Sequence, residues 1–157
     1  MATLIATRAA STFPVFKALG AGIVCAAYGS YDLAANPTAA DIINFCKLPA
    51  GATVIGGWFR LEDVDTNEAE EVDIDIGYAA NGDVNADPDG FGNFGVLNGD
   101  AVTNYLPEGG TLLPLHGVLK DGFVTFTKET TITGTVNVDA LTFAAGTASV
   151  VVLYVTA

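Results

Sequence analysis

The sequence is poor in positive charge. Its 157 residues include 6 Lys and Arg against 18 Asp and Glu, which gives a net charge of −12. Proteins that bind nucleic acid neutralise phosphates with clustered Lys and Arg, so this balance excludes nucleic acid as a partner. The acids are also unevenly placed, because residues 62–100 hold 12 of them and no Lys or Arg. Residues 1–31 have the opposite character, since they carry Arg8 and Lys17 and no acid.

The sequence also lacks the segments and motifs of membrane proteins and common enzymes. Apolar runs such as residues 149–155 are much shorter than the roughly 18 residues that a membrane-spanning helix needs, so no membrane partner is expected. Neither GxxxxGK[ST] nor a GxGxxG that opens a helix is present. The single histidine, His116, has no serine in a nucleophile-elbow context to activate, and we expect it in a packed or edge position. No catalytic residue and no cofactor is therefore assigned.

Residues 1–30 make a poor secretion signal. Lys17 interrupts the apolar stretch, and no small-residue cleavage site follows it. We therefore expect an intracellular product in which the two cysteines, Cys25 and Cys46, are buried thiols. Two cysteines cannot form a zinc site alone, and a disulfide would form only if they lay on adjacent strands.

Short β-strands are the dominant pattern. Between residues 72 and 76, Val and Ile alternate with Asp, which predicts a half-buried strand whose carboxylates face water. Asp121-Gly122 predicts a two-residue hairpin. One helical turn is expected at 37–43, with Thr38 as cap and Asp41 as the second residue of a capping box. Eight strands are predicted in all: 22–31, 42–48, 53–61, 72–76, 111–119, 123–128, 130–138 and 148–156.

These strands predict an all-β fold, a β-sandwich or jelly roll of about eight antiparallel strands, with a β-barrel as the alternative. The sandwich is expected to be one domain over residues 21–157. Residues 1–20 are expected to form an extended N-terminal arm that adds a strand to a neighbouring sheet, unless this terminus is disordered. The high apolar content indicates that apolar surface is buried between subunits as well as within them, so we expect an oligomer.

A long acidic loop is predicted at about 79–105. It is rich in Asn, Asp and Gly and contains Phe91, Phe94 and Tyr105. Long loops often carry function, so these three aromatic residues are candidate partner contacts. Alternatively, the loop folds back on the domain as a lid.

Two clusters of acids in the acidic stretch have spacings that relate to metal binding or catalysis. One resembles part of a calcium-binding loop, but its glycine falls at the eighth position instead of the sixth, so it provides only weak candidates for a cation. The weak candidates are Asp83, Asn85, Asp87 and Asp89. The other is the pair Asp73 and Asp75, which lie about 6.6 Å apart along one strand face, a spacing that overlaps that of inverting glycosidases. Because many other acids surround this pair and no base is near, we interpret it as a solvated acidic face and do not expect an enzyme.

The sequence from residue 41 onward resembles the β-sandwich structural proteins of tailed-phage heads. The similarity lies in turn and strand residues, over roughly residues 41–157. The segments that carry it are DIINFCKLPAGATVIGG at 41–57, LEDVDT at 61–66, VDIDIG at 72–77, residues 136–140, AGT at 145–147 and the closing strand to Tyr154.

This resemblance implies a capsid decoration, or cement, protein. Such a protein would be a homotrimer made in the host cytoplasm and located on the outer surface of the virion capsid, with the major capsid protein as its partner. The capsid contact is then expected in the N-terminal arm, at Arg8, Phe13, Phe16 and Lys17.

A receptor- or carbohydrate-binding module of a phage fibre or tail is the alternative. Exposed aromatic side chains would stack on sugars in such a module. The candidates are Trp58, Tyr78, Phe91, Phe94 and Tyr105. Trp58 argues against this alternative, because its place in the middle of a strand, between Gly57 and Phe59, predicts a core position.

Overall fold

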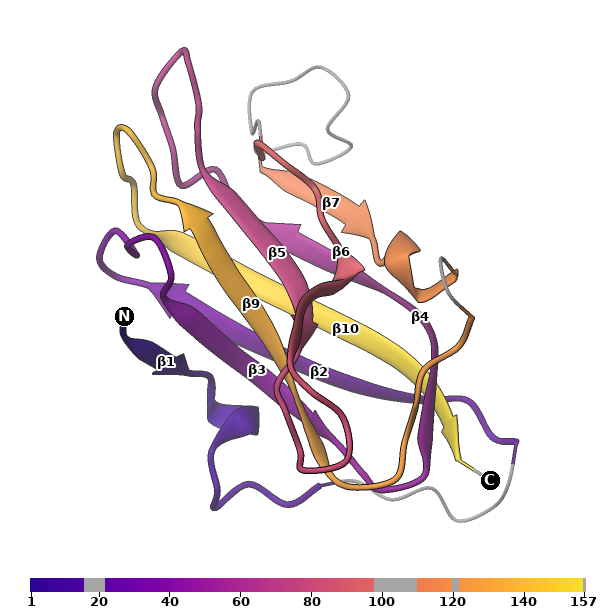
Figure 1. Ribbon diagram of the computed structural model, residues 1–157. Helices are drawn as coiled ribbons and strands as arrows, with labels where there is room; N and C mark the ends of the chain where they lie inside the picture. The colour runs from indigo at the N-terminus through magenta and orange to yellow at the C-terminus, as the bar shows by residue number, and fades with distance from the viewer. Residues whose placement is uncertain (16–21, 98–109, 120–121, 157) are drawn as a thin grey trace.

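The computed structural model describes residues 1–15, 22–97, 110–119 and 122–156, and it contains two β-sheets packed face to face (Figure 1). The first sheet has the order β1-β3-β9-β5-β6, with bounds Thr3–Ile5, Ile42–Leu48, Thr130–Val138, Asp73–Tyr78 and Asp87–Gly92. The second has the order β2-β10-β4-β7, with bounds Cys25–Leu33, Gly146–Thr156, Ala52–Leu61 and Thr111–Pro114. A short strand, β8 (Thr125–Phe126), also pairs with β4. The predicted all-β sandwich is confirmed.

The N-terminal residues differ from the expected arm. Strand β1 pairs in parallel with β3 of its own chain, with Leu4 opposite Ile43. A 3-10 turn, η1 (Thr7–Ala9), follows, and the side chains of Ala6 and Ala9 are buried. Residues 1–9 therefore lie on the domain instead of extending from it. Phe16 and Lys17 fall outside the described residues.

Strands β7 and β8 are shorter than predicted, and they do not form a hairpin with each other. Both pair with β4, β7 along residues 58–61 and β8 along residues 52–53. Pro114 ends β7, because it has no N–H for a ladder bond, and the chain turns into the 3-10 helix η2 (His116–Leu119). Of the predicted hairpin turn, Asp121 lies outside the described residues. Within those residues, no helix has the length and apolar character needed to cross a bilayer.

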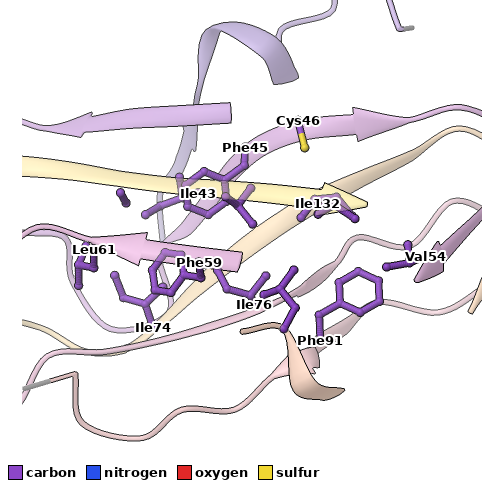
Figure 2. Close-up of a cluster of buried hydrophobic side chains, with 14 of the residues drawn as sticks. Ile43, Phe45, Cys46, Val54, Phe59, Leu61, Ile74, Ile76, Phe91 and Ile132 are labelled. Atoms are coloured by element: carbon purple, nitrogen blue, oxygen red, sulfur yellow. The ribbon is translucent and has the colours of Figure 1, made fainter. Parts of the chain in front are cut away.

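The core lies between the two sheets (Figure 2). Alternate residues of each strand point inward, so that Ile74 and Ile76 of β5 face Phe59 and Leu61 of β4 across a closely packed interior. Aromatic rings fill its centre, where Phe45 and Phe59 meet edge to face at 6.3 Å between centroids. Figure 2 shows these rings together with Ile43, Ile132, Val54 and Phe91.

Both cysteines are free and buried, as predicted. Cys25 lies on β2 and Cys46 on β3, which belong to different sheets. Burial raises the pKa of the Cys46 thiol to about 12.

The segment at 38–41 is a turn and not the predicted helical turn. Its predicted side-chain contact is nevertheless present, because the backbone N–H of Thr38 donates to Oδ2 of Asp41 at 3.0 Å. Ala40 has a φ of 71°, outside the helical region, so no helix can continue through it. The other carboxyl oxygen of Asp41 accepts from the N–H of Ala2 at 2.5 Å and so fixes the start of β1.

Two glycines allow backbones to approach closely at places that shape the domain. A Cβ on Gly29 of β2 would overlap the carbonyl oxygen of Phe45 on β3, so this glycine lets the edges of the two sheets meet. A Cβ on Gly77 of β5 would overlap the carbonyl oxygen of Asp87. The start of β6 therefore crosses the outer face of β5.

Candidate partner-binding surfaces

Arg8 is held on the surface of β2 by aromatic contacts. Its guanidinium carbon lies 3.7 Å from the ring centroid of Tyr28 and 4.9 Å from that of Phe13. Its Nη2 also donates a hydrogen bond to the Tyr28 hydroxyl at 2.5 Å. The structure thus brings together Arg8 and Phe13, two of the residues predicted to contact a capsid, and orders them on the domain surface.

A groove of about 420 Å³ lies beside this cluster. Its walls come from residues 13–15, from β2 and from the end of β10, and its lining includes Lys47 and Tyr154. Lys47 forms an ion pair with Glu129 at 3.0 Å. The N-terminal segment therefore builds a mixed aromatic and cationic surface on an otherwise acidic protein.

The predicted loop aromatics do not form a common surface. Phe91 lies in β6, not in a loop, and is fully buried, with its ring 5.4 Å from that of Tyr78. This corrects its assignment as a loop contact, because a ring in the core cannot meet a partner. Phe94 is half-buried and stacks on Phe59 at 5.9 Å between centroids, as expected for a loop that folds back on the domain. Tyr105 lies outside the described residues.

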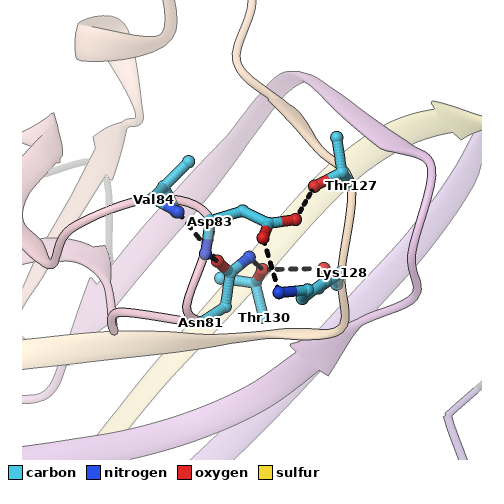
Figure 3. A network of polar contacts seen from close by, with 6 residues as sticks. All are labelled: Asn81, Asp83, Val84, Thr127, Lys128 and Thr130. Carbon is cyan, nitrogen blue, oxygen red and sulfur yellow. Dashed lines mark hydrogen bonds and ion pairs between the residues drawn. The ribbon is translucent and has the colours of Figure 1, made fainter.

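The three carboxylates among the four weak candidates for a cation site each interact with a different residue. Asp83 pairs with Lys128 at 2.5 Å and accepts a hydrogen bond from Thr127 (Figure 3). The hydrogen bond from Lys128 lowers the pKa of Asp83, as expected for a carboxylate beside a cation. Asp87 accepts from the Tyr78 hydroxyl at 3.5 Å. Asp89 accepts a hydrogen bond from the side chain of Asn93 at 3.4 Å, and the fourth candidate, Asn85, has an amide side chain. Among the residues that the structure describes, no group of three or more His, Cys, Asp and Glu could hold a metal ion.

Asp75 is buried, which corrects the prediction of a solvated acidic face on β5. Its side chain is 5% exposed, and the backbone of Phe94, in the segment after β6, lies against its carboxyl group. Burial raises the pKa of Asp75, although Asn137 donates a hydrogen bond to its Oδ2 at 2.7 Å. The periodicity placed Ile74 and Ile76 correctly inside, but it carries no information about which segment covers the outer face.

Trp58 is exposed, which corrects its predicted core position. It lies on β4 with 46% of its surface accessible, while its neighbours Gly57 and Phe59 are buried. A β-bulge explains the difference. The register between β4 and β10 shifts where Val54 pairs with Tyr154 and Gly56 with Leu153, so Ile55 is an extra residue. One extra residue reverses the faces of the side chains that follow it, and Trp58 turns outward.

Chains from phage capsid structures share this fold. A chain of the capsid of Ralstonia phage GP4 matches with a TM-score of 0.73 and 19% identity, over 99% of this chain and 98% of that chain. A chain of the cyanophage Pam1 capsid asymmetric unit matches with a TM-score of 0.65 and 23% identity, over 94% of both chains.

A third match is a chain of the acidic stable capsid of Helicobacter pylori bacteriophage KHP30, with a TM-score of 0.54 and 13% identity, over 87% of this chain and 90% of that chain. No family model and no curated protein matches the sequence. At these identities the likeness establishes the fold, an all-β sandwich that also occurs in phage capsid structures.

Proposed function

We propose that this protein is a structural protein of a tailed-phage virion, which binds the outer surface of the capsid as a homotrimer and stabilises the shell. The observation that carries the proposal is the match to a capsid chain over nearly the whole of both chains. A match that extends from one end of the domain to the other supports a shared architecture for the complete unit, not one shared motif.

The internal bonds of the acidic residues support binding rather than catalysis. Glycoside hydrolysis, the chemistry considered for Asp73 and Asp75, needs two carboxyls that flank a shared substrate. Here Asp75 is buried and accepts a hydrogen bond from Asn137, and Asp83 is paired with Lys128. Asp65 accepts hydrogen bonds from the backbone N–H groups of Glu71, Leu141 and Thr142. These described carboxylates hold segments of the chain together.

Shell stabilisation in this proposal follows from bridging. A trimer presents three identical contacts to neighbouring copies of the major capsid protein, and each contact after the first forms at a high effective concentration. The bound trimer then opposes separation of the capsid subunits. The proposed capsid contact is the surface around Arg8 and Phe13, and the other two candidates, Phe16 and Lys17, lie outside the described residues.

Capsids prepared without this protein test the proposal. The purified chain should co-sediment with them saturably, and R8A and F13A should each bind at least about tenfold more weakly, which corresponds to about 1.4 kcal/mol. K128A is the control, because Lys128 is also an exposed cation, and neither it nor its ion-pair partner Asp83 belongs to a proposed contact surface. A wild-type chain that does not bind these capsids would overturn the proposal.

The alternative is a carbohydrate-binding module of a fibre or tail, and the exposed indole of Trp58 is the observation that favours it. Aromatic faces of this kind stack on sugar rings. Saturable glycan binding that is lost in W58A but kept in F94A would support this alternative. Phe91 is not a useful probe, because its substitution would disturb the core.

A further inference from the structure

The outer face of the second sheet carries a continuous row of apolar side chains. Strand register places Tyr28 of β2 opposite Val151 of β10, Val151 opposite Trp58 of β4, and Trp58 opposite Pro114 of β7. Residues directly opposite each other in a sheet share a face, with Cβ atoms about 5 Å apart. Tyr28 and Trp58 are 48% and 46% exposed. We call this row, with its outward-facing neighbours, the aromatic face.

The neighbours on one side of this row extend the apolar surface. There Leu153 lies opposite Ala26 and Gly56, and a Cβ on Gly56 would meet no atom within 4 Å. The row on the other side is polar at Ser30, Ser149 and Arg60, and it becomes apolar again at Leu112, which is 40% exposed. The side chains on the outward face of an antiparallel sheet are normally polar. An apolar row across four strands therefore marks an interaction surface.

The aromatic face belongs to the less charged of the two sheets. The strands of the second sheet contain one acid, Asp32, and one base, Arg60. Those of the first sheet contain one base, Lys47, and four acids: Asp73, Asp75, Asp87 and Asp89. Glu62, just after β4, is paired with Arg60 at 3.1 Å.

This distribution of charge indicates what covers the face. Two copies of a chain with a net charge of −12 repel each other unless the surface they share is nearly free of acids. The aromatic face meets that condition, whereas the first sheet does not. An interface between identical subunits is also the kind that most resembles a cut protein core, rich in aromatic and aliphatic side chains.

The size of the face is sufficient for association. Three strands of 9 to 11 residues and the four-residue β7, about 4.8 Å apart, present a surface of roughly 540 Å². A stable interface buries about 800 Å² of accessible surface per partner. The accessible surface of a patch is larger than its flat area, because side chains project from the sheet. The second sheet can therefore supply most of one interface.

We propose that the aromatic face is the surface through which one copy of this chain binds a second copy, with Trp58 near its centre. This inference deepens the oligomer of the proposed function. Tyr28 also carries the Arg8 side chain, so the aromatic face borders the proposed capsid contact at β2, whereas Trp58 lies two strands further along the sheet. Tyr28 and Trp58 are the expected main contributors, because large aromatic side chains dominate the energy of most interfaces.

Gly56 offers a direct test of this proposal. Its backbone φ is not in the left-handed region, and a side chain there would point into open space, so G56E should fold normally while it adds an acid to the face. W58E provides a second acid on the same face. L141E is the matched control, because Leu141 is a comparably exposed apolar residue, 52% accessible, in the connection between β9 and β10.

Sedimentation equilibrium of the full chain and the three variants measures association, and circular dichroism and thermal unfolding confirm that each variant folds. We expect the wild type and L141E to be oligomers, and G56E and W58E to have a dissociation constant at least 100-fold higher. A monomeric wild type, or G56E and W58E variants that associate as the wild type does, would overturn the proposal.

Capsid co-sedimentation of the same proteins separates this proposal from the proposed function. If G56E dissociates into monomers and these still bind capsids weakly, the self-interface and the capsid contact are distinct, as proposed. If G56E stays oligomeric but loses capsid binding, the aromatic face contacts the capsid, and a second copy is not its occupant. A wild-type oligomer that dissociates on G56E but never binds capsids would support this inference and contradict the proposed function.

Discussion

At the scale of single residues, Asp65 and Asp75 show that the pKa of a buried carboxyl group can be shifted in either direction. Burial by itself raises the pKa of Asp65. The backbone N–H groups of Thr142, Glu71 and Leu141 lower this pKa by a larger amount, so the net shift is downward. Burial and the nearby charges of Asp73 and Asp89 raise the pKa of Asp75, and the hydrogen bonds from Asn137 and the Phe94 backbone offset only part of this effect. The sign of the pKa shift follows from the balance of burial and like charges against hydrogen-bond donors.

Substituting Asp65 by Asn should destabilise the protein at neutral pH. Asn offers one acceptor where the carboxylate offers two, so buried N–H groups of Leu141 or Thr142 lose their partner, at a cost of about 2 kcal/mol. Because the pKa of Asp65 is lowered in the folded state, the stabilisation it gives is present above about pH 4 and is lost as the pH falls below that. Urea unfolding should show that the difference in the free energy of unfolding between the wild type and D65N is smaller at pH 3 than at pH 7. An equal difference at both pH values would contradict this account.

The D75N variant should behave in the opposite way. A carboxyl whose pKa is raised in the folded state costs stability once it ionises, so the wild type loses stability from this group as the pH rises through that pKa. Asn keeps an oxygen to accept from Asn137 and carries no charge. We expect D75N to be more stable than the wild type by about 1 kcal/mol at pH 7, with the gain absent at low pH. A loss of stability at pH 7 would show that the charge of Asp75 is needed.

At the scale of elements, the close approaches at Gly29 and Gly77 should be the least tolerant positions of their strands. A methyl group at either position overlaps a backbone carbonyl oxygen, which cannot move without disrupting a strand. We expect G29A and G77A to lower stability by about 1 to 3 kcal/mol, a typical cost of overpacking. G56A is the control, because it adds the same methyl group to a strand where no atom lies within 4 Å. Equal thermal stability of G29A and G56A would refute this role for Gly29.

Some elements could be predicted from the sequence and others could not, for reasons visible in the strands. Strands β3, β9 and β10 were recognised because their apolar periodicity reflects burial between two sheets. Strand β6 was missed because its sequence, DPDGFG, has the composition of a loop, and its pairing with β5 comes from tertiary context. The inward face of β4 was predicted wrongly at Trp58 because the alternation was continued through Gly56 and Gly57, although glycine inside a strand often marks a bulge.

The candidate sites were predictable to a smaller extent. Arg8 and Phe13 are candidates because of the resemblance to phage head proteins, with the positive charge of the N-terminal segment as the sequence feature behind Arg8, and the structure places both around Tyr28. The aromatic face was not recognised, because it arises from the register of four strands that are distant in sequence. A row of side chains across a sheet exists only once the strand order is known.

At the scale of the whole molecule, the net charge of −12 should make stability depend on salt. Like charges repel in the compact state, and added ions screen this repulsion beyond a Debye length of about 10 Å at 0.1 M salt. We expect the unfolding temperature to rise by about 2 to 4 °C between low salt and 0.5 M NaCl, which corresponds to roughly 1 kcal/mol for a domain of this size. A falling temperature would mean that ion pairs such as Lys128 with Asp83 outweigh the repulsion.

The burial of Cys46 has a kinetic consequence. Thiol reagents react with the thiolate, and a buried thiol with a pKa of about 12 is almost entirely protonated at pH 8. Cys46 is 1% exposed, but it lines the groove beside Phe13, so modification requires the wall of that groove to move aside. In excess reagent, the labelling rate of Cys46 therefore measures how often the N-terminal segment opens locally on the domain.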